Sequence, residues 1–484
     1  MIEKLKNLRY NLTKNVQIEN LKNFFIRTPR SFFYALKENF PGKNSKLGII
    51  GITGTKGKTS VSFILYHVLS SKFATSLIST IEAKIGGENV DTGFHVTSPD
   101  SNQIYKLLKK SLDAKTEKVV LEVTSHGIFQ KRVSFIDFEV AVFTNIARDH
   151  LDYHPSFEHY LWSKSLLFRG KNLKLSVLNF DDELSFEYLK KHAKGKILTY
   201  SIKNENADIF GKILETNENG TRFLVKIKKD VLVSKSNHNQ HGKSFDSLRM
   251  TLPNNESGMT NLEDESFEKE VSKSEEVEFF MPVLGEVYVS NALSAIAVGI
   301  FYNIPLEEIS KSLKNFSGVP GRMEKIDEGQ KFSVLVDFAH TPDSLQKLLE
   351  SVQKIRKSPN QQIITVFGNA GERDPERRKM GGVSAKLSDI TILTAEDPRS
   401  EGVEKIMAEA EKYAVENGAI LGKNLFKIGD RRTAIKTAFE MAKDGDIVLL
   451  SGKGHEQSMN LGNGEEWWDD RVVAREELKK LLRK

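Results

Sequence analysis

The stretch LGIIGITGTKGKTS, residues 47–60, decides how the chain folds. Its first half is apolar and reads as a short buried strand, and its second half is a glycine-rich loop. The residues that follow repeat apolar side chains at the spacing of one helix face, at Val61, Ile64, Leu65, Val68 and Leu69. The order strand, glycine loop and helix predicts the start of an α/β domain.

The loop itself indicates phosphate binding. Backbone N–H groups of such a loop, at the N-terminus of a helix, form a cradle for phosphate oxygens. Lys58 can neutralise the β- and γ-phosphates of a nucleotide, and the Thr59 hydroxyl can bind Mg²⁺. The spacing departs from a strict Walker A motif by one residue, so a glycine-rich turn without nucleotide stays the alternative.

Further strands extend this pattern into two α/β units. Residues 118–123 and 138–143 are apolar runs separated by helical patterns, which is typical of a parallel sheet covered on both faces. A second group of apolar runs occupies 332–336, 363–367, 390–393 and 446–450. We therefore predict a P-loop central domain with a parallel sheet, followed by a Rossmann-like C-terminal α/β domain.

Composition shifts divide the chain into three predicted parts. A short helical segment fills 1–46, a central domain 47–317 and a C-terminal domain 318–484, and the polar stretch 234–276 is predicted to be a surface insertion. The first part mixes Phe and Leu with Lys and Arg. We expect its aromatic side chains to pack on the central domain, and a helix lying on a membrane surface is the alternative.

Composition also excludes several classes of protein. The 484 residues are 39% hydrophobic and carry a net charge of +6, which is too small for a dedicated nucleic-acid binder. The chain has no cysteine, so disulfides, Cys-ligated zinc, Fe–S clusters and a cysteine nucleophile are excluded. No apolar run reaches the ~20 residues of a membrane span and the N-terminus lacks a signal sequence, so a cytoplasmic protein is expected.

Other candidate residues follow predicted strands. Glu122, at the end of a strand near the glycine loop, is either a magnesium ligand or a solvated strand end. His150 could be a second metal ligand or a structural histidine. Arg322 could reach phosphate across a cleft between the domains. The motifs EDPRSE (396–401) and SGKGHEQ (451–457) follow strands and should lie at the carboxyl edge of the second sheet, where α/β proteins bind ligands.

Ten strings in this order resemble the Mur ligases, most closely the MurE type. They are GTKGKTS, HVTSPD, LEVTSHGIFQKRV, VAVFTNIARDHLDYHPSFEHYLWSKSLLF, NALSAIAVG, GVPGRMEKI, DFAHTPDSL, GERDPERRKMG, EDPRSE and SGKGHEQ, and they cover roughly residues 47 to 484. The resemblance implies an ATP-dependent ligase that adds an amino acid to UDP-N-acetylmuramoyl-L-alanyl-D-glutamate through an acyl phosphate. The uridine-binding domain that precedes the loop in the family is expected to be missing.

The resemblance also implies roles for individual residues. The nucleotide and its phosphates would contact Gly54, Thr55, Gly57, Lys58, Thr59, Ser60, Asn291, Arg322, Asp337 and His340. Mg²⁺ would be bound by Thr59, Glu122, His150 and Lys164, the last as a carbamate formed with CO₂. The catalytic set would be Lys58, Glu122, His150 and Lys164. The muramoyl peptide would contact Thr97, Ser98, Thr124, Gln130 and Arg132. The incoming amino acid would contact Arg373, Asp397, Pro398, Arg399, Gly452 and Glu456.

Arg399 resembles the residue that pairs with the distal carboxylate of meso-diaminopimelate, which makes this diamino acid the expected substrate. The expected cofactors are ATP and Mg²⁺, and the expected partners are small molecules, with no nucleic acid, no stable membrane insertion and a monomeric state. Alternatives are a related ligase with another acceptor or amino acid, such as lysine or a folylpolyglutamate, and a non-catalytic regulator that binds nucleotide or muropeptide.

Overall fold

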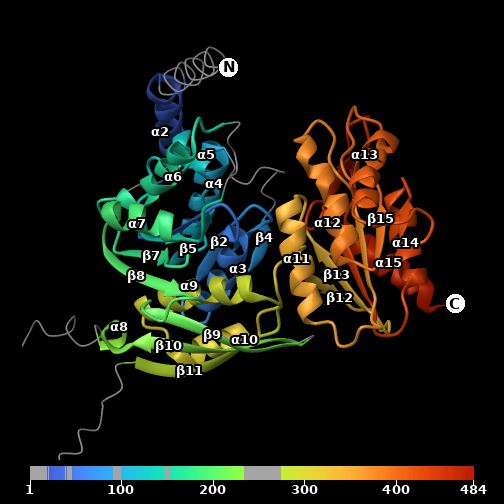
Figure 1. Ribbon diagram of the computed structural model, residues 1–484. Helices are drawn as coiled ribbons and strands as arrows, with labels where there is room; N and C mark the ends of the chain where they lie inside the picture. Colours follow the sequence, from blue (N-terminus) through green and yellow to red (C-terminus); the bar gives the residue numbers. More distant parts are fainter. Residues whose placement is uncertain are drawn as a thin grey trace, which may run out of the picture.

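The computed structural model describes residues 19, 21–38, 40, 46–90, 100–147, 153–217, 219–233 and 274–483. Two α/β units lie side by side, each built on its own sheet (Figure 1). The first unit runs from blue to yellow and the second from orange to red. No helix in the described ranges is both long and apolar enough to cross a membrane.

Within the described residues, the first sheet has eleven strands. In spatial order they are β11 (Ser274–Met281), β10 (Gly220–Lys228), β9 (Ile209–Asn217), β8 (Lys196–Ser201), β7 (Leu175–Asn179), β6 (Phe138–Phe143), β1 (Gly48–Thr53), β5 (Lys118–Glu122), β2 (Thr75–Ile78), β3 (Ala83–Ile85) and β4 (Glu88–Val90). Neighbours from β9 to β2 are parallel, and antiparallel strands extend the sheet at both edges. The central place of β1 puts the glycine loop at the middle of the carboxyl edge.

Helices cover both faces of this sheet. One face packs against α3 (Lys58–Ser70), α9 (Glu286–Phe301) and α10 (Leu306–Lys314). The other face packs against α4 (Ser101–Asp113), α5 (Ser125–Phe129), α6 (Phe157–Ser165), η3 (Leu166–Arg169) and α7 (Glu183–His192). Ile50 and Ile52 of β1 point to the first face and Ile49 to the second, as the alternation of side chains along a strand requires. The remaining helices are η1 (Asn23–Arg27), α2 (Thr28–Lys37) and α8 (Lys229–Val233).

The second sheet, as far as the structure describes the chain, has six strands, in the order β12 (Glu324–Ile326), β13 (Ser333–Asp337), β17 (Ile447–Ser451), β14 (Ile363–Phe367), β15 (Ile390–Leu393) and β16 (Leu425–Lys427). All neighbours except β12 and β13 are parallel. One face packs on α11 (Pro342–Lys354), α12 (Met380–Leu387) and α13 (Val403–Glu416), and the other on α14 (Arg431–Met441) and α15 (Asp470–Leu482). Also present are η4 (Pro375–Lys379) and the hairpin of β18 (Ser458–Asn460) and β19 (Glu465–Trp467).

The predicted α/β class and its strands are confirmed. β6, β14 and β15 have the bounds that the sequence predicts, and the bounds of β5, β13 and β17 differ from the predicted ones by one residue. The first sheet lies within 47–317 and the second within 318–484. Most of the predicted insertion lies outside the described residues, but Ser274–Glu276 belong to β11, because their backbone pairs with β10.

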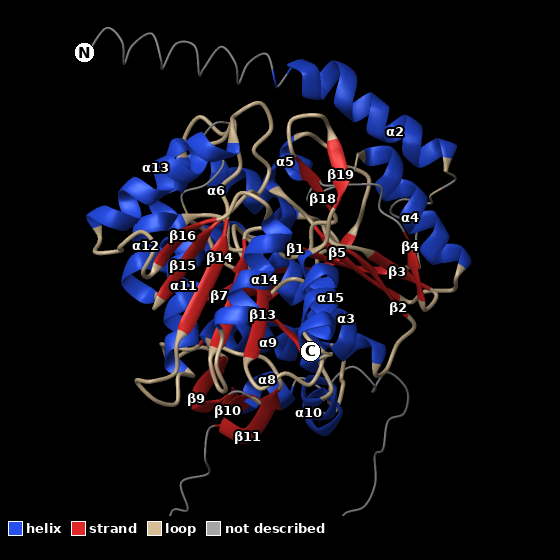
Figure 2. Cartoon of the chain, turned by 90° about the vertical axis from the view of Figure 1, so that its right-hand side faces the viewer, coloured by secondary structure: helices blue, strands red, loops and turns tan. Residues whose placement is uncertain are grey.

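The expected packing of the N-terminal aromatic residues on the central domain is confirmed for some of them and wrong for others. The Phe32 ring lies beside that of Phe135, with centroids 5.3 Å apart, and Tyr34 packs against the buried core below α2. Phe40 is buried and lies beside Tyr105 of α4, with ring centroids 5.8 Å apart. In contrast, Phe24, Phe25 and Phe33 are exposed. The helix lies across the surface near α4 (Figure 2), so only one narrow side of it faces the domain, and that side carries small residues.

Candidate active site

Two glycines shape the glycine loop between β1 and α3, which is called the phosphate loop below. Gly57 precedes α3 with φ of +83°, a left-handed conformation that strains other residues. A Cβ atom at Gly57 would lie 2.9 Å from Oδ1 of Asn291, and one at Gly54 would collide with the Thr144 hydroxyl. Asn291 is buried on α9, and its Nδ2 has no hydrogen-bond partner among the described residues. That amide group is therefore available to a ligand in the loop.

The end of β6 fixes the loop in place. The Thr55 N–H donates to the Asn145 carbonyl at 2.8 Å, and the Thr144 hydroxyl donates to the Lys56 carbonyl at 2.6 Å. Lys58 folds over the loop, and its Nζ donates to the carbonyls of Gly54 at 3.2 Å and Thr55 at 3.0 Å. These carbonyls hold the ammonium group over the same loop whose N–H groups would bind phosphate.

A hydroxyl and a carboxylate meet beside the loop. Thr59 Oγ1 lies 3.2 and 3.1 Å from the two carboxylate oxygens of Glu122, which is 3% exposed at the end of β5. The Thr80 N–H donates to the same carboxylate at 3.1 Å. Hydroxyl and carboxylate oxygens are ligands that Mg²⁺ prefers, so this pair fits the metal. The described residues contain no cluster of three or more His, Cys, Asp or Glu side chains suited to a metal.

Lys164 points at the phosphate loop from α6. Its side chain is 1% exposed, and its Nζ donates to the Gly54 carbonyl at 2.6 Å and lies 4.4 Å from the centre of the Tyr160 ring. The Tyr160 hydroxyl in turn lies 3.1 Å from Oγ1 of Thr55. Lys164 and Tyr160 thus pack directly against the phosphate loop.

The candidate peptide-binding residues follow β5. Thr124 is the N-cap of α5, and its hydroxyl accepts from the Gly127 N–H at 3.0 Å. Gln130 Oε1 accepts from Nε and Nη2 of Arg132 at 3.0 and 2.7 Å, and its Nε2 donates to the Tyr153 hydroxyl at 3.1 Å. Burial lowers the pKa of Arg132. The result is an oriented guanidinium group suited to an anionic ligand.

The carboxyl end of β13 carries a second group of predicted residues. Asp337 accepts from the Ala339 and Met323 N–H groups, both at 2.8 Å, and burial raises the pKa of its carboxyl group. The Arg322 guanidinium lies 4.4 Å from the centre of the Phe338 ring, which also touches His340. Asp337 thereby shapes the turn that presents Arg322.

Contacts join this group to the first unit. The Tyr288 hydroxyl of α9 donates to the Arg322 carbonyl at 2.8 Å. Lys56 of the phosphate loop forms an ion pair with Asp343 in the first turn of α11. The phosphate loop and Arg322 thus lie on two units that touch each other.

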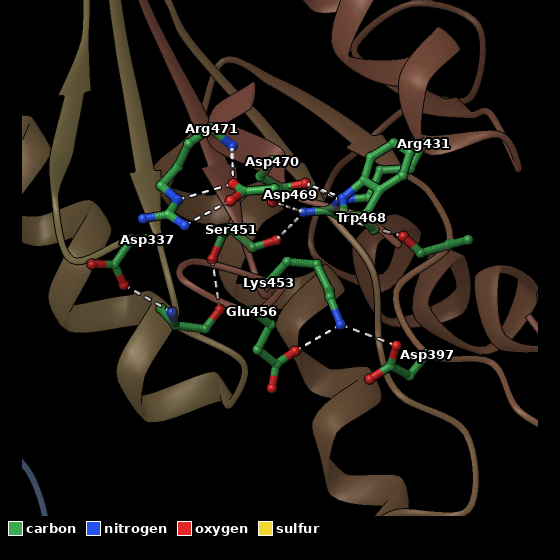
Figure 3. Close-up of polar contacts among 12 residues, drawn as sticks. Asp337, Asp397, Arg431, Ser451, Lys453, Glu456, Trp468, Asp469, Asp470 and Arg471 are labelled. Carbon is green, nitrogen blue, oxygen red and sulfur yellow. Dashed lines mark hydrogen bonds and ion pairs between the residues drawn. The ribbon is translucent and has the colours of Figure 1, made fainter. Parts of the chain in front are cut away.

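A buried lysine organises the third group (Figure 3). Lys453 follows β17, is 1% exposed, and its Nζ lies 3.0 Å from Asp397 and 2.7 Å from Glu456. The Asn460 N–H also donates to Asp397 at 3.0 Å. One ammonium group therefore holds two of the predicted amino-acid-binding carboxylates in place.

The neighbouring Glu396 has an unusual environment. It is 5% exposed, its Oε2 has no hydrogen-bond partner in the described ranges, and burial raises the pKa of its carboxyl group to about 7. Gly452 lies directly over it, since a Cβ there would be 3.2 Å from that oxygen. Below these loops, Arg431 and Asp470 form a fully buried ion pair at 2.6 Å. Arg431 also donates to the Ala395 and Ser451 carbonyls, which fixes the ends of β15 and β17.

Comparison with known proteins identifies the family. Residues 52–243 match the Mur ligase middle domain, and residues 321–454 match the Mur ligase glutamate ligase domain. The UDP-N-acetylmuramoyl-L-alanyl-D-glutamate–2,6-diaminopimelate ligase of Caldanaerobacter subterraneus subsp. tengcongensis is 34% identical over 454 residues, which are 93% of this chain and 82% of that protein. The enzyme of the same name from Fusobacterium nucleatum is 35% identical over 441 residues, covering 90% and 78%.

This chain belongs to the Mur ligase family. It is a MurE-like, ATP-dependent ligase that forms amide bonds in the synthesis of peptidoglycan precursors.

Solved structures agree with this assignment. A UDP-N-acetylmuramoyl-L-alanyl-D-glutamate–2,6-diaminopimelate ligase matches with a TM-score of 0.61 and 27% identity, over 94% of this chain and 83% of that one. A folylpolyglutamate synthase from Thermotoga maritima matches with a TM-score of 0.60 at 14% identity, over 88% and 90%, and so shares the fold alone.

The predicted residues of this Mur ligase fall into groups. Gly54, Thr55, Gly57, Lys58, Thr59, Ser60, Glu122, Lys164 and Asn291 belong to the phosphate loop or the elements around it. Asp397, Pro398, Arg399, Gly452 and Glu456 lie in the loops after β15 and β17, where the Arg399 N–H donates to the Asn460 carbonyl at 3.1 Å. Arg373 is exposed on the loop after β14. Thr97, Ser98 and His150 lie outside the described residues.

Sequence reasoning missed Lys453, Glu396 and the Arg431–Asp470 pair. Lys453 lies in the motif SGKGHEQ, and a lysine between two glycines after a buried strand could have indicated an anchored charge. Glu396 precedes Asp397 in the motif EDPRSE, but nothing in that string tells which carboxylate is buried. Arg431 and Asp470 are 39 residues apart, and no local pattern links them.

Proposed function

We propose that this ligase joins meso-2,6-diaminopimelate to UDP-N-acetylmuramoyl-L-alanyl-D-glutamate with conversion of ATP to ADP and phosphate, as a cytoplasmic monomer. The contact of Thr59 with Glu122 beside the phosphate loop carries the proposal, because it fits a magnesium–nucleotide complex. The names of the relatives and the presence of Arg399 beside Asp397 support the choice of substrates.

The first step transfers a phosphoryl group. A carboxylate oxygen of the acceptor attacks the γ-phosphorus, ADP leaves, and an acyl phosphate forms. Lys58 and the N–H groups of the loop neutralise the charge on the phosphates, and Arg322 approaches from the second unit. Mg²⁺, when held by Thr59 and Glu122, would supply further charge neutralisation.

The second step forms the amide bond. The amine of the diamino acid attacks the acyl carbon, the tetrahedral adduct loses phosphate, and the nitrogen loses a proton. Arg399 would pair with the distal carboxylate of the diamino acid, while Asp397 and Glu456, held by Lys453, would bind its ammonium group. The pocket therefore holds the nucleophile in place, and closure of the two units would keep water from the acyl phosphate.

The test is phosphate release and product mass with ATP, Mg²⁺ and the UDP-linked dipeptide, with meso-diaminopimelate and L-lysine in separate reactions. We expect a product that gains one diaminopimelate residue and none that gains lysine, and Glu122→Gln should lower the rate more than about a hundredfold. The opposite amino-acid preference would discard the role of Arg399 and keep the reaction. Turnover of Glu122→Gln at the wild-type rate would overturn the metal site.

A further inference from the structure

The N-terminal helices expose a set of large apolar side chains. We call it the aromatic face, and it consists of Leu21, Phe24, Phe25, Ile26, Phe32, Phe33 and Leu36. Phe24 is 73% exposed, Phe25 68% and Phe33 60%. Between Leu21 and Leu36 the chain runs through two consecutive helices, the π-helix η1 and α2. Water-exposed apolar surface of this extent indicates a binding surface rather than chance exposure.

The helix is nevertheless fixed to the domain by its other side. The Ser31 hydroxyl is buried, where it lies 2.8 Å from Oγ of Ser101 and donates to the Lys131 carbonyl at 2.7 Å. Ala35 is buried in the same contact. Two members of the aromatic face lie at the edge of this contact, because the Phe32 ring is 5.3 Å from that of Phe135 and Phe24 lines a hollow with Phe129 and Trp162. The other members point outward, and both views place α2 at the rim of the first unit (Figures 1 and 2).

Charge separates this segment from the rest of the chain. Residues 1–37 contain eight Lys and Arg against two Glu, a net charge of +6, which equals the net charge of all 484 residues. The remaining residues are therefore neutral as a whole. Between Glu19 and Glu38 there is no acidic residue, and the basic residues Lys22, Arg27, Arg30 and Lys37 lie among the aromatic ones.

We propose that the aromatic face docks on an anionic lipid bilayer, with Phe and Leu side chains at the level of the headgroups and the Lys and Arg side chains on lipid phosphates. Apolar side chains beside basic ones on a surface helix match both parts of such an interface. A second copy of this chain fits less well, because its own aromatic face would bring the same positive charge to the contact.

Docking would also orient the ligase. Ser31 contacts Lys131, which lies between the candidate peptide-binding residues Gln130 and Arg132. The acceptor side of the first unit would therefore face the bilayer, near any enzyme that uses the product there. The docking itself does not depend on the proposed reaction.

The experiment is co-sedimentation of the full chain with phosphatidylcholine vesicles, with and without phosphatidylglycerol, at low and high salt. We expect binding only to the anionic vesicles and weaker binding at high salt. The double variant Phe24→Ser and Phe25→Ser should lower the partition coefficient at least about tenfold, since each ring buried in the interface contributes more than that factor. Leu184→Ser with Val415→Ser, two exposed apolar residues elsewhere, should leave binding unchanged.

A pair of charge variants tests the electrostatic part. Lys22→Glu with Lys37→Glu should abolish the preference for anionic vesicles, whereas Lys331→Glu with Lys423→Glu, at exposed positions of the second unit, should keep it. ATP-dependent ligation in solution should be the same in all four variants, which shows that each is folded. Equal binding by the Phe variants and the wild type, no binding to anionic vesicles, or a dimer that the Phe variants disrupt would each overturn the proposal.

Discussion

At the scale of single residues, Lys164 offers a chemical test of the site. Its buried Nζ points at the phosphate loop, where a carboxylate, unlike an ammonium group, could bind Mg²⁺. Lys164→Ala should lower turnover more than about a hundredfold, because the ligand would be lost. Added formate or acetate should restore part of the phosphate release, while Lys171→Ala should be neutral. Full activity of Lys164→Ala would remove the carbamate from the mechanism.

Glu396 makes stability depend on pH in a predictable direction. Its pKa is about 7 in the folded protein, against 4.5 in an unfolded chain, because burial disfavours the charged form. The native state therefore binds more protons between these values, and the stability from this group is present below pH 4.5 and lost as the pH rises through 7. This pH-dependent loss amounts to on the order of 3 kcal/mol of unfolding free energy, and Glu396→Gln should abolish it.

The measurement is urea unfolding of the wild type and Glu396→Gln at acidic and alkaline pH. As the pH rises, the unfolding free energy of the wild type should fall relative to that of the variant. Glu404→Gln, at an exposed site, should follow the wild type. A pH-independent difference between wild type and Glu396→Gln would contradict a buried, protonated Glu396.

At the scale of elements, two glycines with the same φ angle allow the effect of backbone strain to be distinguished from that of a side-chain contact. Gly57 and Gly87 both have φ of +83°, but only Gly57 is next to another side chain, that of Asn291. Alanine at either position should cost about 1–2 kcal/mol of unfolding free energy through backbone strain. Only Gly57→Ala should also raise the KM for ATP, by about tenfold or more, because it displaces the phosphate loop. An equal effect of the two variants on the KM for ATP would contradict a specific role of Gly57 in shaping the phosphate loop.

The elements also show what the sequence could predict. β6 and β14 are short, mainly apolar runs between polar segments, so their bounds follow from the local sequence. The orientation of α2 does not, because an amphipathic pattern predicts that the apolar side is buried, whereas the structure turns the small residues Ser31 and Ala35 toward the domain. The phosphate loop was predictable from local spacing, whereas the Lys453 cluster depends on loops that the second sheet brings together.

At the scale of the whole molecule, the ion pair between Lys56 and Asp343 connects the two units. Both side chains are largely exposed, so the pair contributes less than about 1 kcal/mol to stability. Asp343→Asn should therefore leave unfolding by urea unchanged. It should slow phosphate release several-fold, because the arrangement in which the phosphate loop contacts α11 would be less populated. High salt should lower the wild-type rate toward that of the variant, and Asp113→Asn, from the exposed pair with Lys109, should have no effect. A loss of stability with unchanged rate would contradict this role.

The antiparallel pair of β10 and β11 has a practical consequence. Lys228 and Ser274 are register partners, so the chain leaves the sheet and returns to it at neighbouring positions. A folded guest whose own ends are close together, such as a fluorescent protein, could replace residues 234–273 without changing the distance that the sheet must bridge. The ligase would then carry an internal reporter on the edge of the sheet far from β1, which leaves both termini free for other uses.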